Sequence, residues 1–352
     1  MTPPDALATG VSPTGGGARP REDASPRLLC RPLGRLLRRA PDEIERRSAG
    51  FAIRSAAGRR LVSGLGSAFI RGYNASLAPG PLRRLPEEGA TIEPHFRPFF
   101  FEGVAMGYLP RGWLFRGVGP RSAERDLLSM APEYLYLYYV GLGFWTAIRH
   151  PGAPRALERL GEHLEARYLP LCYDGFGFKV GFFDYPRRPA SRAVLDRGPE
   201  EHRTALYQGF GRALFFVFMD DEDGFRRACD GSGGRRDEME FGRSLALAFT
   251  GIDRPERIAA HVERAPDFAN RMARLTGVTW ALTARAMTDA DYFRGCVSRA
   301  PGGWSALMTD LPVLCGKALA ASRTYAEWQS RTRDAAARAL AERGLAGSAP
   351  SR

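Results

Sequence analysis

Apolar stretches with helical spacing recur along this chain of 352 residues, and prolines or glycines separate one stretch from the next. Within residues 57–77, Leu61, Leu65, Phe69 and Tyr73 recur at intervals of four, which places them in one stripe along a helix. Similar patterns predict further helices at 132–149, 153–168, 268–287 and 305–342. We therefore predict a mainly α protein, a single compact helical domain with a few short strands or Gly-aromatic loops.

Composition and charge narrow the class of protein. Hydrophobic residues make up 44% of the chain and charged residues 26%, as in globular proteins, and no run reaches the roughly 18 apolar residues of a membrane-spanning helix. The net charge is +12, and residues 1–50 and 323–352 each contribute an excess of three positive charges to it. The remainder is spread thinly, without the concentrated basic face of a nucleic-acid-binding protein, so we expect no nucleic-acid partner.

The chain divides into three predicted segments. Residues 1–45 are expected to form a disordered basic tail, 46–330 the helical core domain, and 331–352 a surface helix that ends in a tail. Leucines lie among arginines in residues 27–47, which fits either a basic segment at a membrane surface or a short docking helix, and we favour the helix. At most a peripheral membrane contact is expected. The N-terminus lacks the apolar core of a secretory signal, which predicts a cytoplasmic protein.

An internal duplication is indicated in the second half of the chain. Residues 209–230 align with residues 240–263 at an offset of 31, with Phe210, Gly211 and Arg212 among the matched positions. Each copy reads as an apolar helix, a polar turn and a charged amphipathic helix. The alternative is coincidence in a sequence rich in Arg, Ala and Phe.

The segment 172–185 alternates glycines with aromatic residues. Gly175, Gly177 and Gly181 predict a strand or a tight loop in which the backbone comes close to another group. Their spacing is not that of a dinucleotide-binding loop, and the five cysteines and five histidines of the chain are scattered. The sequence therefore carries no signal for a nicotinamide, flavin, haem or zinc cofactor.

Four segments together resemble a known family: RRSAGF to FIRGYNASL (46–77), FRPFFFEGVAMGY (96–108), YDGFGFKVGFFDYPR (173–187) and YQGFGRALFFVF (207–218). They are similar, in the same order, to the domain-of-unknown-function family DUF1702, best known from gene clusters that make enediyne polyketides and other natural products. Lys179 stands where the family usually has histidine, and the segment 219–240 is more acidic than is usual. The resemblance implies natural-product biosynthesis, with other proteins of the pathway as partners.

Aromatic side chains are abundant in and near these motifs. Together with the resemblance, they lead us to expect an aromatic-lined cavity that holds a long apolar intermediate of the polyene type. The rings expected to line it are Phe99, Phe100, Phe101, Tyr134, Tyr136, Tyr138, Tyr139, Phe144, Trp145, Phe215 and Phe216.

An acidic run follows the apolar helix that ends near residue 218. Asp220, Asp221 and Asp223 are spaced so that their carboxylates can converge on Mg²⁺, a cation that prefers oxygen ligands. The run is similar to the aspartate-rich motif of class I isoprenoid synthases, which implies a magnesium-dependent cyclase of a prenyl diphosphate. Arg226 and Arg227 are then candidates for binding the diphosphate. The alternative is that the run ends a helix in solvent.

Buried ionisable groups supply the remaining candidates. Glu102 lies in an apolar run, so it is either an acid or base with a raised pKa or the partner of a basic ligand-binding candidate, Arg212 or Arg243. Asp174 and Lys179 form a second candidate pair, in which Lys179 acts as a base or anion binder or pins the segment by a salt bridge.

Three functions remain open at this stage. The first is a biosynthetic cyclase, lyase or isomerase acting on an apolar polyene-type small molecule. The second is the magnesium-dependent cyclase. The third is a non-catalytic binding or scaffold protein of the same pathway.

Overall fold

The computed structural model describes residues 30–345, so the predicted tail before residue 30 and the last seven residues lie outside it. Within the described range the chain is helical and contains no β-strand, which confirms the predicted mainly α class. The α-helices are α1 (Cys30–Leu37), α2 (Glu43–Ser48), α3 (Ala56–Ser76), α4 (Leu85–Ala90), α5 (Arg97–Leu114), α6 (Pro120–Met130), α7 (Leu135–Arg149), α8 (Ala156–Gly161), α9 (Leu169–Lys179), α10 (Arg203–Val217), α11 (Glu222–Asp230), α12 (Arg236–Thr250), α13 (Pro255–Glu263), α14 (Phe268–Thr288), α15 (Ala290–Val297), α16 (Trp304–Ala320) and α17 (Tyr325–Glu342).

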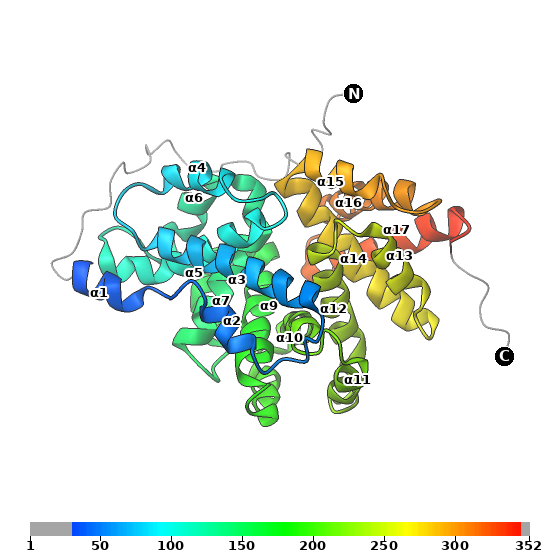
Figure 1. Cartoon of the computed structure of the whole chain (residues 1–352), viewed down its shortest axis with the longest axis horizontal. Coiled ribbons are helices and arrows are strands. Elements are labelled where there is room, and N and C mark those ends of the chain that lie inside the picture. The colour runs from blue at the N-terminus through cyan, green and yellow to red at the C-terminus, as the bar shows by residue number, and fades with distance from the viewer. Residues whose placement is uncertain (1–29, 346–352) are drawn as a thin grey trace. The chain divides into compact units, whose positions relative to one another are not determined.

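The described residues form two compact units, one ending at Arg243 and one beginning at Ser244. In the first unit the long helices pack in the order of the chain, α3 against α5, α5 against α7, α7 against α9 and α9 against α10, while shorter helices connect them (Figure 1). Gly103 faces Phe69, and Gly107, one turn later, faces Tyr73. The helices α3 and α5 therefore run in the same direction.

Glycines set the spacing of these helices. A Cβ atom placed on Gly143 of α7 would lie 1.9 Å from the carbonyl oxygen of Cys172 on α9, and one placed on Gly175 of α9 would lie 2.0 Å from that of Val140 on α7. Such distances are impossible for any residue with a side chain, so the backbones touch only because both positions are glycine. The same reciprocal contact joins α3 to α5 through Gly72 and Gly103, α9 to α10 through Gly177 and Gly209, and α10 to α12 through Gly211 and Gly242.

The glycines reveal a longer repeat than the sequence alignment did. Gly-x-Gly pairs begin at Gly141, Gly175 and Gly209, with 34 residues between successive pairs. In each pair the first glycine approaches the preceding long helix and the second approaches the following one. The repeated unit is therefore one long helix plus its connection.

The predicted duplication coincides with helices of matched length. The helices α10 and α12 each have 15 residues, and α11 and α13 each have 9. The helix starts differ by 33 residues, Arg203 to Arg236 and Glu222 to Pro255, rather than by the offset of 31 used in the alignment. The offset of 31 pairs Gly211, the second glycine of α10, with Gly242, the single glycine of α12.

The Gly-aromatic segment 172–185 is neither a strand nor a tight loop. Residues up to Lys179 belong to α9, and Val180–Asp184 continue it as a π-helical turn. The alternation of glycine and aromatic residues arises because two neighbouring helices approach α9, each at one of the glycines. The prediction that the backbone comes close to another group was correct, although the secondary structure expected for it was wrong.

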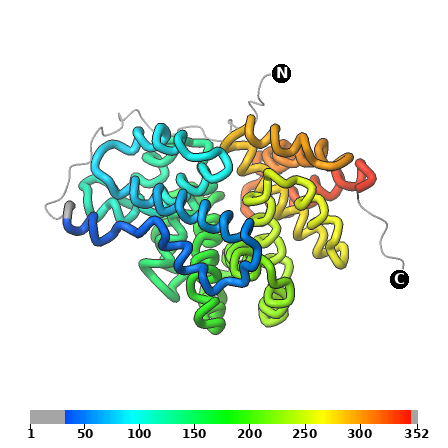
Figure 2. Tube along the Cα trace, viewed as in Figure 1, coloured from blue at the N-terminus to red at the C-terminus, as the bar shows by residue number. Residues whose placement is uncertain are grey.

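Part of the segment expected to be a disordered tail is helical, because α1 and α2 cover residues 30–37 and 43–48. The Tyr73 hydroxyl donates to the Leu37 carbonyl oxygen (3.2 Å), and the Asn74 side chain bonds the backbone N–H and carbonyl of Arg39 (2.9 and 2.8 Å). In Figure 2 this dark blue stretch runs along the row of helices before α3 begins. Buried Leu37 explains why the chain is held here, since it belongs to the core between α3, α5 and α7.

The second unit contains the helices α13 to α17. The helix α14 packs against both α16 and α17, which also pack against each other. Trp280 of α14 stacks on Trp328 of α17 with ring centroids 4.0 Å apart. The predicted surface helix near the C-terminus is thus α17, and it buries one side, including Ala336 and Leu340. No helix within residues 30–345 is both long and apolar enough to cross a membrane.

Candidate active site

Three ionisable side chains from different helices meet inside the first unit. Arg212 of α10 places Nη2 2.6 Å from Oδ1 of Asp174 on α9 and Nη1 3.8 Å from Oε1 of Glu102 on α5. The two carboxyl side chains are only 8% and 5% exposed. We call Glu102, Asp174 and Arg212 the buried triad. It holds two carboxyl groups and one guanidinium group.

The helix crossings force these side chains inward. Glu102 directly precedes Gly103, which faces α3, and Asp174 directly precedes Gly175, which faces α7. Both carboxyl side chains are buried at these helix crossings. Of the two arginines considered for Glu102 from the sequence, the structure places Arg212 beside it.

Burial dominates the ionisation of the two acids. Removal from water raises the pKa of Glu102 to about 7, which Arg212 opposes and Asp174 reinforces. Burial also raises the pKa of Asp174, against the attraction of Arg212. Near neutral pH Glu102 is therefore present in both protonated and ionised forms, as an efficient acid–base group requires.

An aromatic ring lies against the guanidinium group of the triad. The guanidinium carbon of Arg212 lies 4.5 Å above the ring of Phe178, and the Arg212 side chain is 11% exposed. Phe178 in turn contacts Phe144, Phe182 and Phe216, with centroids 5.3 to 6.1 Å apart. The Arg212 Nε is buried and has no hydrogen-bond acceptor among the described residues. A buried donor of this kind is suited to binding an oxygen atom of a ligand.

Most rings that were expected to line a cavity pack against other rings. Phe101 stacks on Tyr134 at 3.8 Å, and Phe100 lies edge-on to Phe101 at 5.3 Å. These side chains are buried at helix interfaces. Phe99, Tyr136 and Phe215 are only partly buried, as is Phe178. The apolar ligand therefore remains a prediction, and these partly buried rings are its candidate contacts.

The predicted pair of Asp174 and Lys179 does not form. Lys179 instead bonds both carboxylate oxygens of Asp184, at 3.0 and 2.8 Å, across the π-helical turn. Asp174 and Lys179 are five residues apart, which in an α-helix is a rotation of about 140° beyond one full turn. Their side chains therefore leave α9 on different sides. Of the two roles proposed for Lys179, the structure is consistent with pinning the segment.

The acidic run after α10 is distributed over separate structural roles. Asp220 accepts backbone N–H bonds from Arg54 (2.7 Å) and Ser55 (2.9 Å), and these bonds lower its pKa. Asp221 caps α11 by accepting from the Gly224 N–H at 2.9 Å. Asp223 forms an exposed ion pair with Arg226, three residues further along α11.

The arginines proposed to bind a diphosphate have local carboxylate neighbours. Arg226 lies 3.0 Å from Asp223, and Arg227 lies 3.8 Å from Asp221. Arg243 of α12 binds both oxygens of Glu222 and stacks over the ring of Phe225 at 4.2 Å. Each of these arginines therefore has its own carboxylate partner.

The donor set of the acidic run does not fit a magnesium centre. No group of three His, Cys, Asp or Glu side chains between residues 30 and 345 is arranged to hold a metal ion. The magnesium-dependent cyclase stays a prediction, and we derive no step from it.

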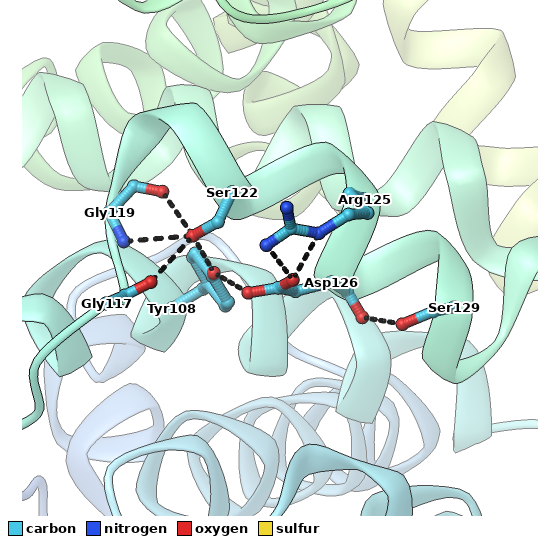
Figure 3. Close-up of polar contacts among 7 residues, drawn as sticks. All are labelled: Tyr108, Gly117, Gly119, Ser122, Arg125, Asp126 and Ser129. Atoms are coloured by element: carbon cyan, nitrogen blue, oxygen red, sulfur yellow. Dashed lines mark hydrogen bonds and ion pairs between the residues drawn. The ribbon is translucent and has the colours of Figure 1, made fainter. Parts of the chain in front are cut away.

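A polar network that the sequence did not indicate fixes the turn between α5 and α6 (Figure 3). The buried Tyr108 hydroxyl donates to Asp126 (2.5 Å) and lies 2.7 Å from the Ser122 hydroxyl. Ser122 Oγ also lies 3.2 Å from the Gly119 carbonyl oxygen, and Arg125 binds the other Asp126 oxygen at 2.9 and 3.0 Å. Tyr108 is at the end of an apolar run, where nothing in the sequence distinguishes it from a core residue.

The fold and the triad define a class of protein: a row of helices joined by glycine contacts, with an ionic cluster buried among three of them. The family model described as protein of unknown function (DUF1702) matches residues 31–298, and the chain belongs to this family. The matched range contains all three members of the buried triad. No curated protein and no solved structure matches the chain.

Proposed function

We propose that this protein is a natural-product biosynthetic enzyme that shifts a double bond in a long, unsaturated, apolar intermediate, with Glu102 as the acid–base group. The observation that carries this proposal is the buried triad, in which Glu102 has a pKa of about 7 and lies beside a guanidinium group with an unpaired buried N–H. An acid that titrates near neutral pH both accepts and returns a proton.

The proposed step needs no cofactor. Ionised Glu102 removes a proton from the saturated carbon between a carbonyl group and a carbon–carbon double bond, and the electron pair of the C–H bond passes into a conjugated dienolate. The Arg212 guanidinium binds the enolate oxygen and stabilises its negative charge. Protonated Glu102 then returns the proton to a carbon further along the conjugated chain, so the product is an isomer of the substrate. Asp174 holds Arg212 in position through the 2.6 Å contact.

The proposed substrate class follows from the surroundings of Arg212. The rings of Phe178 and its neighbours favour an apolar chain, whereas Arg212 favours one oxygen atom within it. A conjugated polyketide of the kind made by enediyne gene clusters has both features. We propose that pathway on the resemblance described above.

The first test replaces Glu102 by Gln in the producing strain. Gln keeps the shape of the side chain but cannot transfer a proton, so we expect the strain to accumulate an unmatured apolar precursor. Asp223→Asn is the control, because Asp223 is exposed, pairs with Arg226 and is not a member of the triad. An unchanged metabolite profile in the Glu102→Gln strain would overturn the proposal.

The same experiment separates the alternative functions. Loss of product in Asp223→Asn and Asp221→Asn strains, with normal product in Glu102→Gln, would favour the magnesium-dependent cyclase. Loss on deletion of the gene but on none of these substitutions would favour a scaffold protein.

Ligand binding is tested with purified protein and diphenylhexatriene, a neutral polyene that fluoresces in apolar surroundings. We expect the wild type to increase its fluorescence and Phe178→Ala to weaken the increase. Phe268→Ala is the control, because Phe268 is exposed (74%) and lies on α14 in the other unit. Equal fluorescence with all three proteins would count against the proposed binding region.

A further inference from the structure

A cleft of about 410 Å³ opens on the outer side of α3, within the first unit. Ile70, Arg71 and Ala75 of α3 line it, together with Arg38 from the segment after α1 and Arg84 from the turn before α4. Its volume is in the range of small-molecule sites. The cleft uses none of the residues of the buried triad.

Positive charge dominates the cleft. Three arginines line it, Arg38, Arg71 and Arg84, and only one acidic residue, Glu88. Arg71 Nε lies 3.4 Å from Glu88 Oε1, and Arg71 Nη2 donates to Thr91 at 2.9 Å. The charges of the lining therefore leave an excess of two positive charges.

Of the three arginines that line the cleft, Arg38 is the one available to bind a ligand. Its side chain is exposed and forms no hydrogen bond or ion pair with any other residue in the described range. Its backbone is nevertheless fixed, because Leu37 and Arg39 on either side are bonded to Tyr73 and Asn74 of α3. The backbone of Arg38 therefore has a fixed position at the edge of the cleft.

The opposite wall is also rigid. Arg84 donates to the carbonyl oxygens of Ala75 (3.3 Å) and Pro79. Arg111 of α5 donates to the carbonyl oxygens of Ser76, Ala78 and Gly80, at 2.5 to 2.7 Å. These bonds hold the turn after α3 in one conformation, so the cleft exists before any ligand binds.

We propose that this cleft binds a phosphate-bearing anion, either a phosphate monoester or a diphosphate. A phosphate monoester carries about −1.5 to −2 charges near pH 7, which matches the excess charge of the lining. Guanidinium groups bind phosphate oxygens in pairs of parallel hydrogen bonds. Ile70, Ala75 and Pro41 supply an apolar floor for the organic part of the ligand. The source of the phosphate is a free metabolite or a lipid headgroup.

The experiment measures binding of inorganic pyrophosphate to the full chain by calorimetry. We expect binding by the wild type and a loss of at least about tenfold in affinity for Arg38→Glu, since the change removes a charge-assisted contact and adds repulsion. Arg35→Glu is the matched control, because Arg35 is also exposed and lies on α1, but does not line the cleft. Circular dichroism verifies that both variants fold.

A second arm identifies the source. Vesicles of phosphatidylcholine, with and without one-fifth phosphatidylglycerol, are sedimented with each protein. Binding only to the anionic vesicles, lost in Arg38→Glu and reversed by pyrophosphate, indicates a lipid headgroup. Pyrophosphate binding without vesicle binding indicates a free metabolite. The proposal is overturned if neither probe binds, or if Arg35→Glu loses as much binding as Arg38→Glu.

Discussion

Gly209 lies directly against the carbonyl oxygen of Asp174: a Cβ atom at Gly209 would be 1.8 Å from it. The contact that sets the distance between α9 and α10 is therefore made by the residue that binds Arg212. Helix packing and the geometry of the buried triad depend on each other.

Replacing Gly209 by Ala tests this dependence. The added methyl group must push α10 away from α9, because the atom it meets belongs to the backbone. We expect a loss of about 2–4 kcal/mol in the free energy of unfolding, measured by urea denaturation. Gly295→Ala is the control: Gly295 lies in α15 with open space around it, so we expect no loss there. Equal effects of the two substitutions would contradict the proposed role of the glycine contacts.

The pH dependence of stability tests the ionisation of Glu102. Its pKa is raised from 4.5 to about 7 in the folded protein, so the folded state binds the proton more tightly than the unfolded state does. The stability that protonated Glu102 contributes to the folded state is therefore lost as the pH rises from its pKa in the unfolded chain, 4.5, through about 7.

The difference between wild type and Glu102→Gln isolates this contribution. We expect the wild type to lose about 2–3 kcal/mol of unfolding free energy relative to Glu102→Gln between about pH 5 and pH 8. Denaturation at several pH values measures it. Parallel pH profiles of the two proteins would show that Glu102 does not titrate in this range.

The role of Asp221 as a helix cap predicts the effects of two substitutions. Asp221→Ala removes the acceptor of the Gly224 N–H and is expected to cost about 1 kcal/mol, whereas Asp221→Ser retains an acceptor and costs less. Millimolar Mg²⁺ is expected to leave the melting temperature of the wild type unchanged, because the nearby carboxylates face different partners. A rise in melting temperature that Asp221→Ser abolishes would instead support metal binding.

Tyr108→Phe tests the network in Figure 3. The substitution removes the bonds to Asp126 and Ser122 but keeps the ring, so we expect a loss of about 1 kcal/mol and faster hydrogen exchange between α5 and α6. Ser129→Ala is the control, since Ser129 is exposed and bonds only the Asp126 carbonyl oxygen. Unchanged exchange in Tyr108→Phe would mean that the network does not fix the turn.

The sequence was informative where one helix face alone decides the structure. The stripe from Leu61 to Tyr73 predicted a helix at 57–77, and α3 spans Ala56–Ser76. The predicted helix at 153–168 ends early, at Gly161, although Leu157, Leu160 and Leu164 are buried as expected. Leu169 packs against Gly161 and the chain turns there. Periodicity identifies the buried side but not a turn imposed by a later residue.

The triad could be predicted only in part. A carboxylate within FFFEGVAMG needs a buried partner, which made Glu102 and an arginine candidates. The sequence alone does not give which helices are neighbours, so Asp174 was assigned to Lys179 instead of Arg212. The Gly-x-Gly pairs contained that information, because each glycine marks a contact with one adjacent helix.

The glycine contacts also have a consequence for how this family can diversify. Since main chain meets main chain at each crossing, the separation of the long helices does not depend on the size of the side chains around it. A substitution at a position such as Phe178 would then alter the proposed ligand contacts while the framework keeps its dimensions. Under the proposed function, one scaffold would in this way accept ligands of different shape.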